Sequence, residues 1–177
     1  MKLKLIAIAV MILSLNVSPN NVQAEQPPVK VQVVANTNHQ PITYLNAKQI
    51  KIQAKRDKLK RVVQYLTTRV HKTAYVFSGS TISGWDCSGM VRYAYKRMNI
   101  VLPHSADKQA HAGTRVSKPR VGDIVVFAYK GSTNFYHSAI YVGEGLIVHA
   151  NLLYKTTVIQ PLSDFKNSQI RFVRVIK

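Results

Sequence analysis

The chain has 177 residues, with 25 lysines and arginines against 7 aspartates and glutamates, which gives a formal net charge of +18. A charge this large predicts an anionic partner, such as nucleic acid, lipid headgroups or an anionic envelope polymer. The single cysteine, Cys87, excludes an intramolecular disulfide, so it is either a small buried hydrophobe or a reactive thiol.

Residues 1–24 have the pattern of a secretory signal peptide. Two lysines precede an apolar run, Leu5–Val17, and small and polar residues follow up to Ala24, after which we expect cleavage. The run of about 13 residues is shorter than the roughly 20 that span a bilayer, so no stable membrane anchor is expected; an uncleaved anchor is the alternative. We expect an exported protein, in the periplasm rather than fully secreted because no wall-binding repeats follow. Export disfavours nucleic acid as the partner.

The rest of the chain is expected to form an extended arm and one domain. Residues 25–46 carry prolines and polar residues without a helical period, although alternating valines permit a short edge strand. Residues 47–177 are enough for one domain with one core. Its first segment, 47 to about 72, has a helical apolar stripe and a broad basic face. We interpret this face as a solvated surface, with membrane binding as the alternative.

Helices are expected first in this domain and strands afterwards. A second helix is predicted from about Asp86 to Arg97, and Ser105 is expected to cap a short helix that ends at about Ala112. After Gly122 the sequence takes the period of strands. The predicted strands are Asp123–Tyr129, Ser138–Val142, Leu146–Asn151, Thr157–Gln160 and Ile170–Ile176. This order predicts an α+β fold, with helices packed on an antiparallel meander of about five strands.

Cys87 lies in the first turn of the predicted second helix, directly after Asp86, a natural N-cap. Unsatisfied backbone N–H groups and the positive end of the helix dipole are found there. We expect this position to lower the pKa of the thiol and to favour a nucleophilic thiolate. The N–H of Cys87 would also face the place where a carbonyl oxygen becomes an oxyanion.

A thiolate nucleophile needs a proton carrier, and the chain has six histidines. Metal ligation is disfavoured, because no zinc-binding spacing is present, and no cofactor is expected. His137 and His149 flank a predicted hairpin; if residues 143–145 form a three-residue loop, Ala139 pairs with His149, and His137 becomes the diagonal neighbour of His149. One imidazole can then take the thiol proton while the other orients it. A two-residue loop would put the two histidines on opposite faces.

Six segments, in this order, make the chain resemble the NlpC-type peptidases, papain-like bacterial cell-wall hydrolases. The resemblance covers about residues 55–177. The segments are Tyr75–Ser80, Asp86–Val91, Leu102–Pro103, Val121–Phe127, His137–Gly143 and Ile147–Ala150.

The resemblance implies the role of each candidate site residue. Cys87 would be the nucleophile, His137 the base and His149 the third, orienting residue. Tyr75 would line the site and help to hold the oxyanion, while Asp86 and Ser88 would contact the peptide. The family cuts peptidoglycan stem peptides, usually between D-glutamate and diaminopimelate or lysine.

Three features depart from the family pattern and bear on substrate preference. They are Ser78 in place of glycine, His104 in place of arginine, and the polar stretch 130–134. Two further functions stay open: an amidase with the same Cys–His chemistry, and an inactive module that binds peptidoglycan. Whichever function it has, we expect basic patches to hold the protein at anionic envelope surfaces.

Overall fold

The computed structural model describes residues 46–177. The predicted signal peptide and all but the last residue of the predicted arm lie outside the described residues. Among residues 46–177, no helix combines the length and the apolar character that a bilayer crossing requires.

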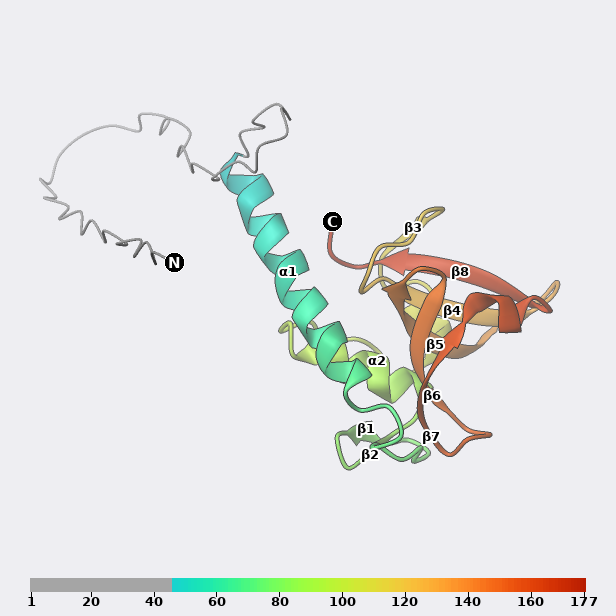
Figure 1. Cartoon of the computed structure of the whole chain (residues 1–177). Helices are drawn as coiled ribbons and strands as arrows, with labels where there is room; N and C mark the ends of the chain where they lie inside the picture. Colours follow the sequence, from blue (N-terminus) through green and yellow to red (C-terminus); the bar gives the residue numbers. More distant parts are fainter. Residues whose placement is uncertain (1–45) are drawn as a thin grey trace, which may run out of the picture.

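The predicted helices and strands follow one another in the predicted order, but three short strands that were not predicted, β1, β2 and β3, lie among them (Figure 1). The elements are α1 (Ala47–Thr67), β1 (Ser80–Thr81), β2 (Gly84–Trp85), α2 (Cys87–Lys96), α3 (Ala106–Gln109), β3 (Thr114–Val116), β4 (Ile124–Tyr129), β5 (Phe135–Gly143), β6 (Leu146–Asn151), β7 (Thr156–Pro161), the 3₁₀ helix η1 (Leu162–Phe165) and β8 (Ser168–Arg174).

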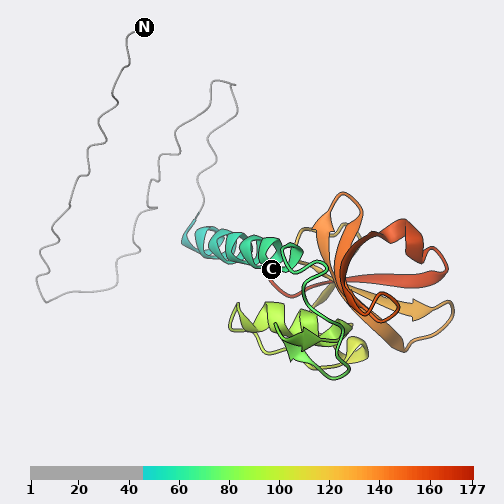
Figure 2. The same ribbon diagram turned by 60° about the horizontal axis from the view of Figure 1, so that its bottom comes forward.

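Helix α1 begins with a capping box, in which Asn46 and Gln49 bond to each other's backbone N–H. Its buried residues all lie in the C-terminal half, at positions 59, 62, 63 and 66, one apolar stripe of a helix. The N-terminal half therefore projects from the domain, as both ribbon views show (Figures 1 and 2).

Six strands form an antiparallel sheet in the order β3-β8-β4-β5-β6-β7. Strands β4 to β7 follow the predicted meander, but β8 does not continue it, because it returns to pair with the free side of β4. The larger core lies between one face of the sheet and helices α1 and α2. A smaller cluster lies on the other face, around Phe127 and Ile147, with Phe165 of η1 packed against it. The predicted α+β class is confirmed.

Long-range hydrogen bonds fix α2 and the segment before it against the sheet. Tyr95 donates its hydroxyl to the carbonyl of Gly122 at 2.8 Å. Trp85 is fully buried and donates its indole N–H to Thr157 of β7 at 2.8 Å. Because these anchors lie near both ends of α2, the helix is fixed against the sheet, where it contacts β5 and β6.

The hairpin between β5 and β6 differs from the prediction in an instructive way. Gly143 pairs with Leu146, so the turn has two residues, Glu144 and Gly145, both at positive φ. Such a turn alone would have separated the two histidines. However, the register shifts between Tyr141 and Gly143, and the pairing of Ile140 with Val148 is the one that the three-residue loop predicted. The bulge therefore compensates for the shorter turn, and His137 and His149 keep the relative register that the three-residue loop predicted.

Several element bounds were predicted wrongly. Helix α1 ends at Thr67 rather than near residue 72, and α3 is one turn that ends at Gln109 rather than near residue 112. The sheet has six strands, because β3 adds a short edge strand that the sequence pattern did not indicate.

Candidate active site

Cys87 is the first residue of α2, and Asp86 is its N-cap as predicted. The Asp86 carboxylate accepts a hydrogen bond from the backbone N–H of Gly89 at 2.7 Å. A Cβ at Gly89 would lie 1.9 Å from the carbonyl oxygen of Gly79. Only glycine therefore lets the loop before the helix close on it, which explains the order of residues in Asp86–Gly89.

The Asp86 carboxylate accepts hydrogen bonds from three further donors. These are the backbone N–H of Ser78 at 2.9 Å, the hydroxyl of Ser88 at 3.1 Å and Nε2 of His104 at 2.9 Å. An ionised carboxylate only accepts, so Nε2 of His104 carries the proton. The side chains of Asp86 and Ser88 are buried and bonded internally. This arrangement explains both residues as supports of the loop, and their contact with substrate stays a prediction.

The Cys87 thiol is half-buried, and the backbone of Ser138 in β5 lies close enough to the thiol to act on its pKa. Burial raises the pKa of the thiol, and the nearby Asp86 charge raises it further. Backbone hydrogen bonds with Ser138, Ser88 and Cys87 itself act in the opposite direction but do not outweigh burial. The prediction of a lowered thiol pKa is therefore wrong: desolvation exceeds the effect of the helix N-terminus, and the resting group is a neutral thiol.

His137 and His149 meet as the hairpin argument predicted. Nε2 of His137 lies 2.8 Å from Nδ1 of His149, and the two rings are nearly perpendicular. Burial first, and then the neighbouring His149, lower the pKa of His137 to about 3. Burial lowers the pKa of His149 to about 4, against the raising effect of its hydrogen bond to Gln160. Both rings are therefore neutral at neutral pH, and a neutral imidazole can accept a proton.

The thiol of Cys87 lies near the strand that carries the imidazole, because the backbone of Ser138, the residue directly after His137, acts on its pKa. Among the hydrogen bonds of residues 46–177, none joins the thiol to His137 itself. Because Nε2 of His137 is engaged by His149, Nδ1 is the nitrogen left for the thiol proton. Catalytic contacts of this kind are often long in an empty site and tighten when substrate binds.

Tyr75 precedes the β1–β2 hairpin, and its backbone N–H bonds to the carbonyl of Lys155. Its half-buried side chain is close enough to Cys87 and Asp86 for their charges to act on it. Burial first, and then these two charges, raise the pKa of the Tyr75 hydroxyl. The hydroxyl therefore keeps its proton and can donate a hydrogen bond near the thiol.

The sequence pattern did not indicate Gln160 as a site residue, because its position relative to His149 depends on the register between β6 and β7. Ile147 pairs with Gln160 and His149 with Val158, so Gln160 is a diagonal neighbour of His149. Its Oε1 lies 2.8 Å from Nε2 of His149. The sequence signal for Gln160 was its polar side chain directly after two β-branched residues of β7, the strand that pairs with the strand of His149.

Within residues 46–177, no group of three or more potential ligands could hold a metal ion.

Comparison with known proteins shows which family the chain belongs to. The sequence profile of the NlpC/P60 family matches residues 72–175, which include the Cys87 loop and both histidine strands. The chain belongs to the NlpC/P60 family.

Two relatives show how far the similarity to other NlpC/P60 proteins extends. A probable endopeptidase of Mycobacterium tuberculosis is 39% identical over 92 residues, which cover 51% of this chain and 23% of the relative. A γ-D-glutamyl-L-lysine dipeptidyl-peptidase of Bacillus cereus is 32% identical over 92 residues, which cover 50% of this chain and 28% of the relative. The chain thus matches about a quarter of the length of these relatives.

Solved structures agree on the fold. The peptidoglycan hydrolase RipB of Mycobacterium tuberculosis superposes with a TM-score of 0.61 at 21% identity, over 71% of this chain and 68% of that one. At this identity the likeness concerns the fold, which is the papain-like α+β arrangement that the sequence predicted.

Proposed function

We propose that this NlpC/P60 protein is an exported cysteine peptidase that hydrolyses stem-peptide bonds of peptidoglycan, between D-glutamate and the following diamino acid. One observation carries the proposal: a thiol at the start of α2 lies near the backbone of Ser138, the residue after His137, and the imidazole of His137 is bonded to a second imidazole, that of His149. This arrangement supports a nucleophile, a base and an orienting group in the order that thiol acyl transfer requires.

The chemistry follows from the protonation states. The Cys87 sulfur attacks the carbonyl carbon of the scissile amide while Nδ1 of His137 takes the thiol proton. The carbonyl electrons move to oxygen, whose charge faces the backbone N–H of Cys87 and the hydroxyl of Tyr75. The C–N bond then breaks, and the imidazolium gives its proton to the leaving amine. Water hydrolyses the resulting thioester by the same steps and restores the thiol.

The substrate class rests on the type of nucleophile and on the relatives. A thiol with an imidazole base is suited to an acyl carbon, whereas sugar cleavage usually needs two carboxylates about 5 to 9.5 Å apart. Asp86 is the only carboxylate next to Cys87 in the sequence, and four donors already occupy it. The Bacillus cereus relative is named for the γ-D-glutamyl-L-lysine bond, which is the bond proposed here.

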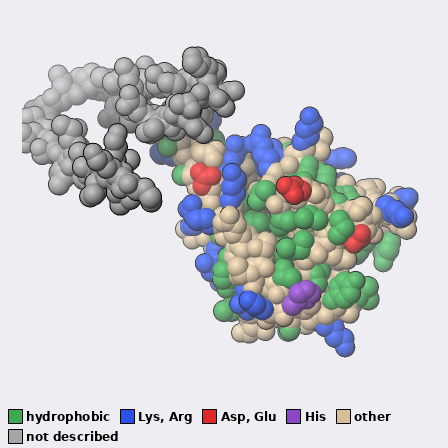
Figure 3. Space-filling model, viewed as in Figure 1, with side chains coloured by type: hydrophobic (Ala, Val, Ile, Leu, Met, Phe, Trp, Pro, Cys, Tyr) green, Lys and Arg blue, Asp and Glu red, His purple; other side chains and the backbone are tan. Residues whose placement is uncertain are grey.

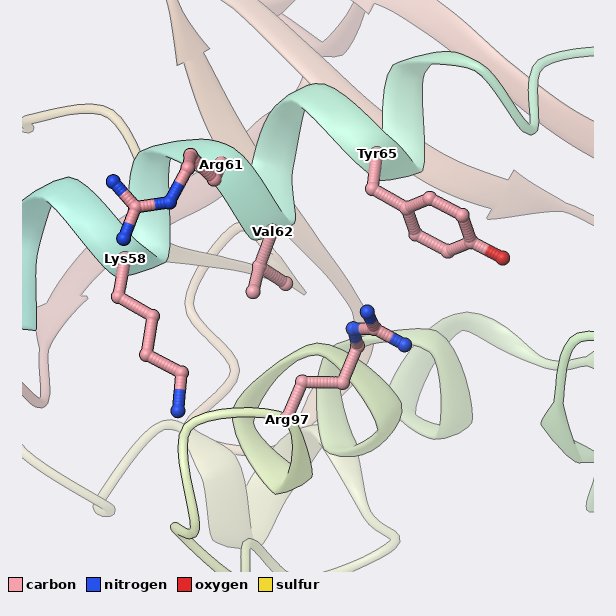
Figure 4. A pocket seen from close by; sticks show the side chains of 5 residues that line it. All are labelled: Lys58, Arg61, Val62, Tyr65 and Arg97. Carbon is pink, nitrogen blue, oxygen red and sulfur yellow. The ribbon is translucent and has the colours of Figure 1, made fainter.

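Retention at the cell wall is proposed to come from basic surface. Lysine and arginine side chains gather along α1 on the face seen in Figure 3. An open groove of about 500 Å³ lies between α1 and the C-terminal end of α2 and is lined by Lys58, Arg61, Val62, Tyr65 and Arg97 (Figure 4). None of the residues that line this α1–α2 groove is acidic, so it fits the carboxylates and phosphates of an envelope polymer.

The test is digestion of purified peptidoglycan with protein recovered after export, whose first residue should be Glu25. Mass analysis should find new amino termini on the diamino acid, and Cys87→Ala and His137→Ala should each lower the rate by at least 100-fold. His111→Ala, a change at an exposed histidine, is the matched control and should keep full activity.

Other products would point to other functions. Glycan freed of whole stem peptides would identify an amidase, and binding without any cleavage would identify a peptidoglycan-binding module. Full hydrolysis by Cys87→Ala would overturn the thiol mechanism altogether.

A further inference from the structure

The pair of imidazoles continues into a longer chain of side-chain hydrogen bonds. Oε1 of Gln160 lies 2.8 Å from Nε2 of His149 and 2.9 Å from Nδ2 of Asn151. Nε2 of Gln160 donates to the carboxylate of Asp164 at 3.3 Å. The chain ends at a turn after β6, where Oδ1 of Asn151 accepts from two backbone N–H groups, those of Leu153 at 2.8 Å and Tyr154 at 3.2 Å.

The donor and acceptor of every bond in this series of side chains follow from the two backbone N–H groups at the Asn151 turn. A backbone N–H can only donate, so the oxygen of the Asn151 amide must face the turn and its NH₂ group must face Gln160. Gln160 therefore meets both Asn151 and His149 with its oxygen, which only accepts. The opposite orientation of Gln160 would place two NH₂ groups together and turn its oxygen toward the Asp164 carboxylate, two unfavourable contacts.

The imidazole protons are then determined one after the other. His149 must carry its proton on Nε2 to donate to Gln160, and in the neutral ring Nδ1 is then an acceptor. His137 must in turn carry its proton on Nε2 to donate to that acceptor. The nitrogen of His137 left with a lone pair is Nδ1, the one that the proposed reaction needs. Both rings are held neutral by burial, so this single pattern of protons applies at neutral pH.

We propose that Gln160, oriented by Asn151, is a positioning residue that selects the tautomer of His137 through His149. Its influence on rate rests on the proposed peptidase function, whereas its influence on the ring protons does not. If the acceptor is removed, an N–H on Nε2 of His149 loses its hydrogen bond, so the tautomer with the proton on Nδ1 becomes the more stable one. His137 must then accept that proton's hydrogen bond at Nε2 and carry its own proton on Nδ1. In that state His137 has no lone pair for the thiol.

The experiment measures ring protons and rate in the same variants. NMR of the folded protein with ¹⁵N-labelled histidine should show His137 and His149 protonated on Nε2 in the native chain. In Gln160→Leu the proton should move to Nδ1 in a measurable fraction of molecules. The kcat for peptidoglycan fragments should fall roughly 100-fold with little change in KM, because a base in the wrong tautomer acts as though absent. Gln169→Leu, the same substitution at an exposed site in β8, is the matched control.

Gln160→Glu separates positioning from mere packing. The carboxylate still accepts from His149, so both tautomers and most of kcat should be kept. Its negative charge favours the imidazolium, so the acid limb of the rate profile should move up by about 1 pH unit or more. A packing role alone would move neither the tautomer nor this limb.

Two results would overturn the proposal. One is a native protein in which His137 carries its proton on Nδ1, and the other is Gln160→Leu with native tautomers and native kcat. If the native protein hydrolyses no peptidoglycan, the ring protons still decide the positioning role, and only the peptidase function fails. If Gln160→Leu does not fold, Gln160→Glu alone decides, since an unmoved acid limb would contradict the chain.

Discussion

The two ends of α2 handle charge in opposite ways. At the N-terminal end, the Asp86 carboxylate is buried and accepts hydrogen bonds from four donors, which come from the loop before the helix, from the helix and from His104. At the C-terminal end, Arg97 faces Lys58 and Arg61 of α1 across the open α1–α2 groove, and the aromatic ring of Tyr65, 4.9 Å from the guanidinium, is its neighbour there.

The contrast shows what each end can do. A buried charge whose hydrogen-bonding capacity is filled by the protein has little left for a ligand, but it fixes the geometry around it. Exposed cations without an acidic partner in their groove hold their geometry loosely and keep their capacity for an anion. We therefore expect substitutions at the N-terminal end to change stability and thiol chemistry, and those at the C-terminal end to change wall binding alone.

The largest expected effect is that of Asp86→Ala on stability. The change removes the N-cap and leaves the buried hydroxyl of Ser88 and the N–H groups of Ser78 and Gly89 without their acceptor. Loss of the cap, which includes the bond to Gly89, costs about 1 kcal/mol, and the unpaired groups of Ser78 and Ser88 cost at least about 1 kcal/mol each, so we expect the free energy of unfolding to fall by roughly 3 kcal/mol or more. Urea denaturation followed by circular dichroism measures it.

Asp164→Ala is the matched control for this change. Asp164 is exposed and accepts a single long hydrogen bond, so its loss should cost less than about 0.5 kcal/mol. Equal losses in the two variants would mean that the four bonds to Asp86 do not stabilise the helix start.

The next effect concerns the pH dependence of the thiol. Because burial and the Asp86 charge raise its pKa, the thiolate fraction should increase about tenfold for each pH unit between 6 and 8. Alkylation by iodoacetamide tracks the thiolate and should rise in the same way, without a plateau. Asp86→Asn keeps a capping side chain but removes the charge, so it should lower the thiol pKa and speed alkylation at pH 7. A plateau below pH 7 in the native protein would instead indicate a thiolate–imidazolium pair.

How much of this could be predicted from the sequence depends on how local each feature is. The caps at Asp86 and Ser105 and the order of helices and strands follow from local patterns, and the structure confirms them. The bulge after Tyr141 could not be predicted, because the backbone of Tyr141 bonds to residues 122 and 123, outside its own hairpin. The same holds for Gln160, whose contact with His149 depends on the pairing of two strands.

The thiol pKa was predicted in the wrong direction for a similar reason. The helix N-terminus is visible in the sequence, but the burial of Cys87 against β5 is a product of the whole fold. The role of each site residue in catalysis stays a prediction, since the geometry joins His137 to His149 and puts Cys87 near the strand of His137 without showing turnover. The adjacency of the histidines was predicted correctly, although the turn assumed for it was not the one that forms.

The smallest expected effect lies at the C-terminal end of α2 and tests the α1–α2 groove. The double variant Lys58→Gln, Arg61→Gln removes two exposed cations one helical turn apart, on the same side of α1. Each exposed charge contributes about 0.3 kcal/mol, near the low end for exposed ion pairs, so the loss of two should lower affinity for sedimented peptidoglycan roughly threefold at low salt. Because salt screens such contacts, the difference from the native protein should shrink as ionic strength rises toward 0.3 M.

The matched control is the double variant Lys130→Gln, Lys166→Gln, which removes the same charge from exposed loops away from the groove. If this control weakens binding as much as the groove variant does, net charge alone holds the protein at the wall, and the groove has no special part. A loss confined to the groove variant, with unchanged stability and unchanged alkylation of Cys87, would show that the two ends of α2 act independently.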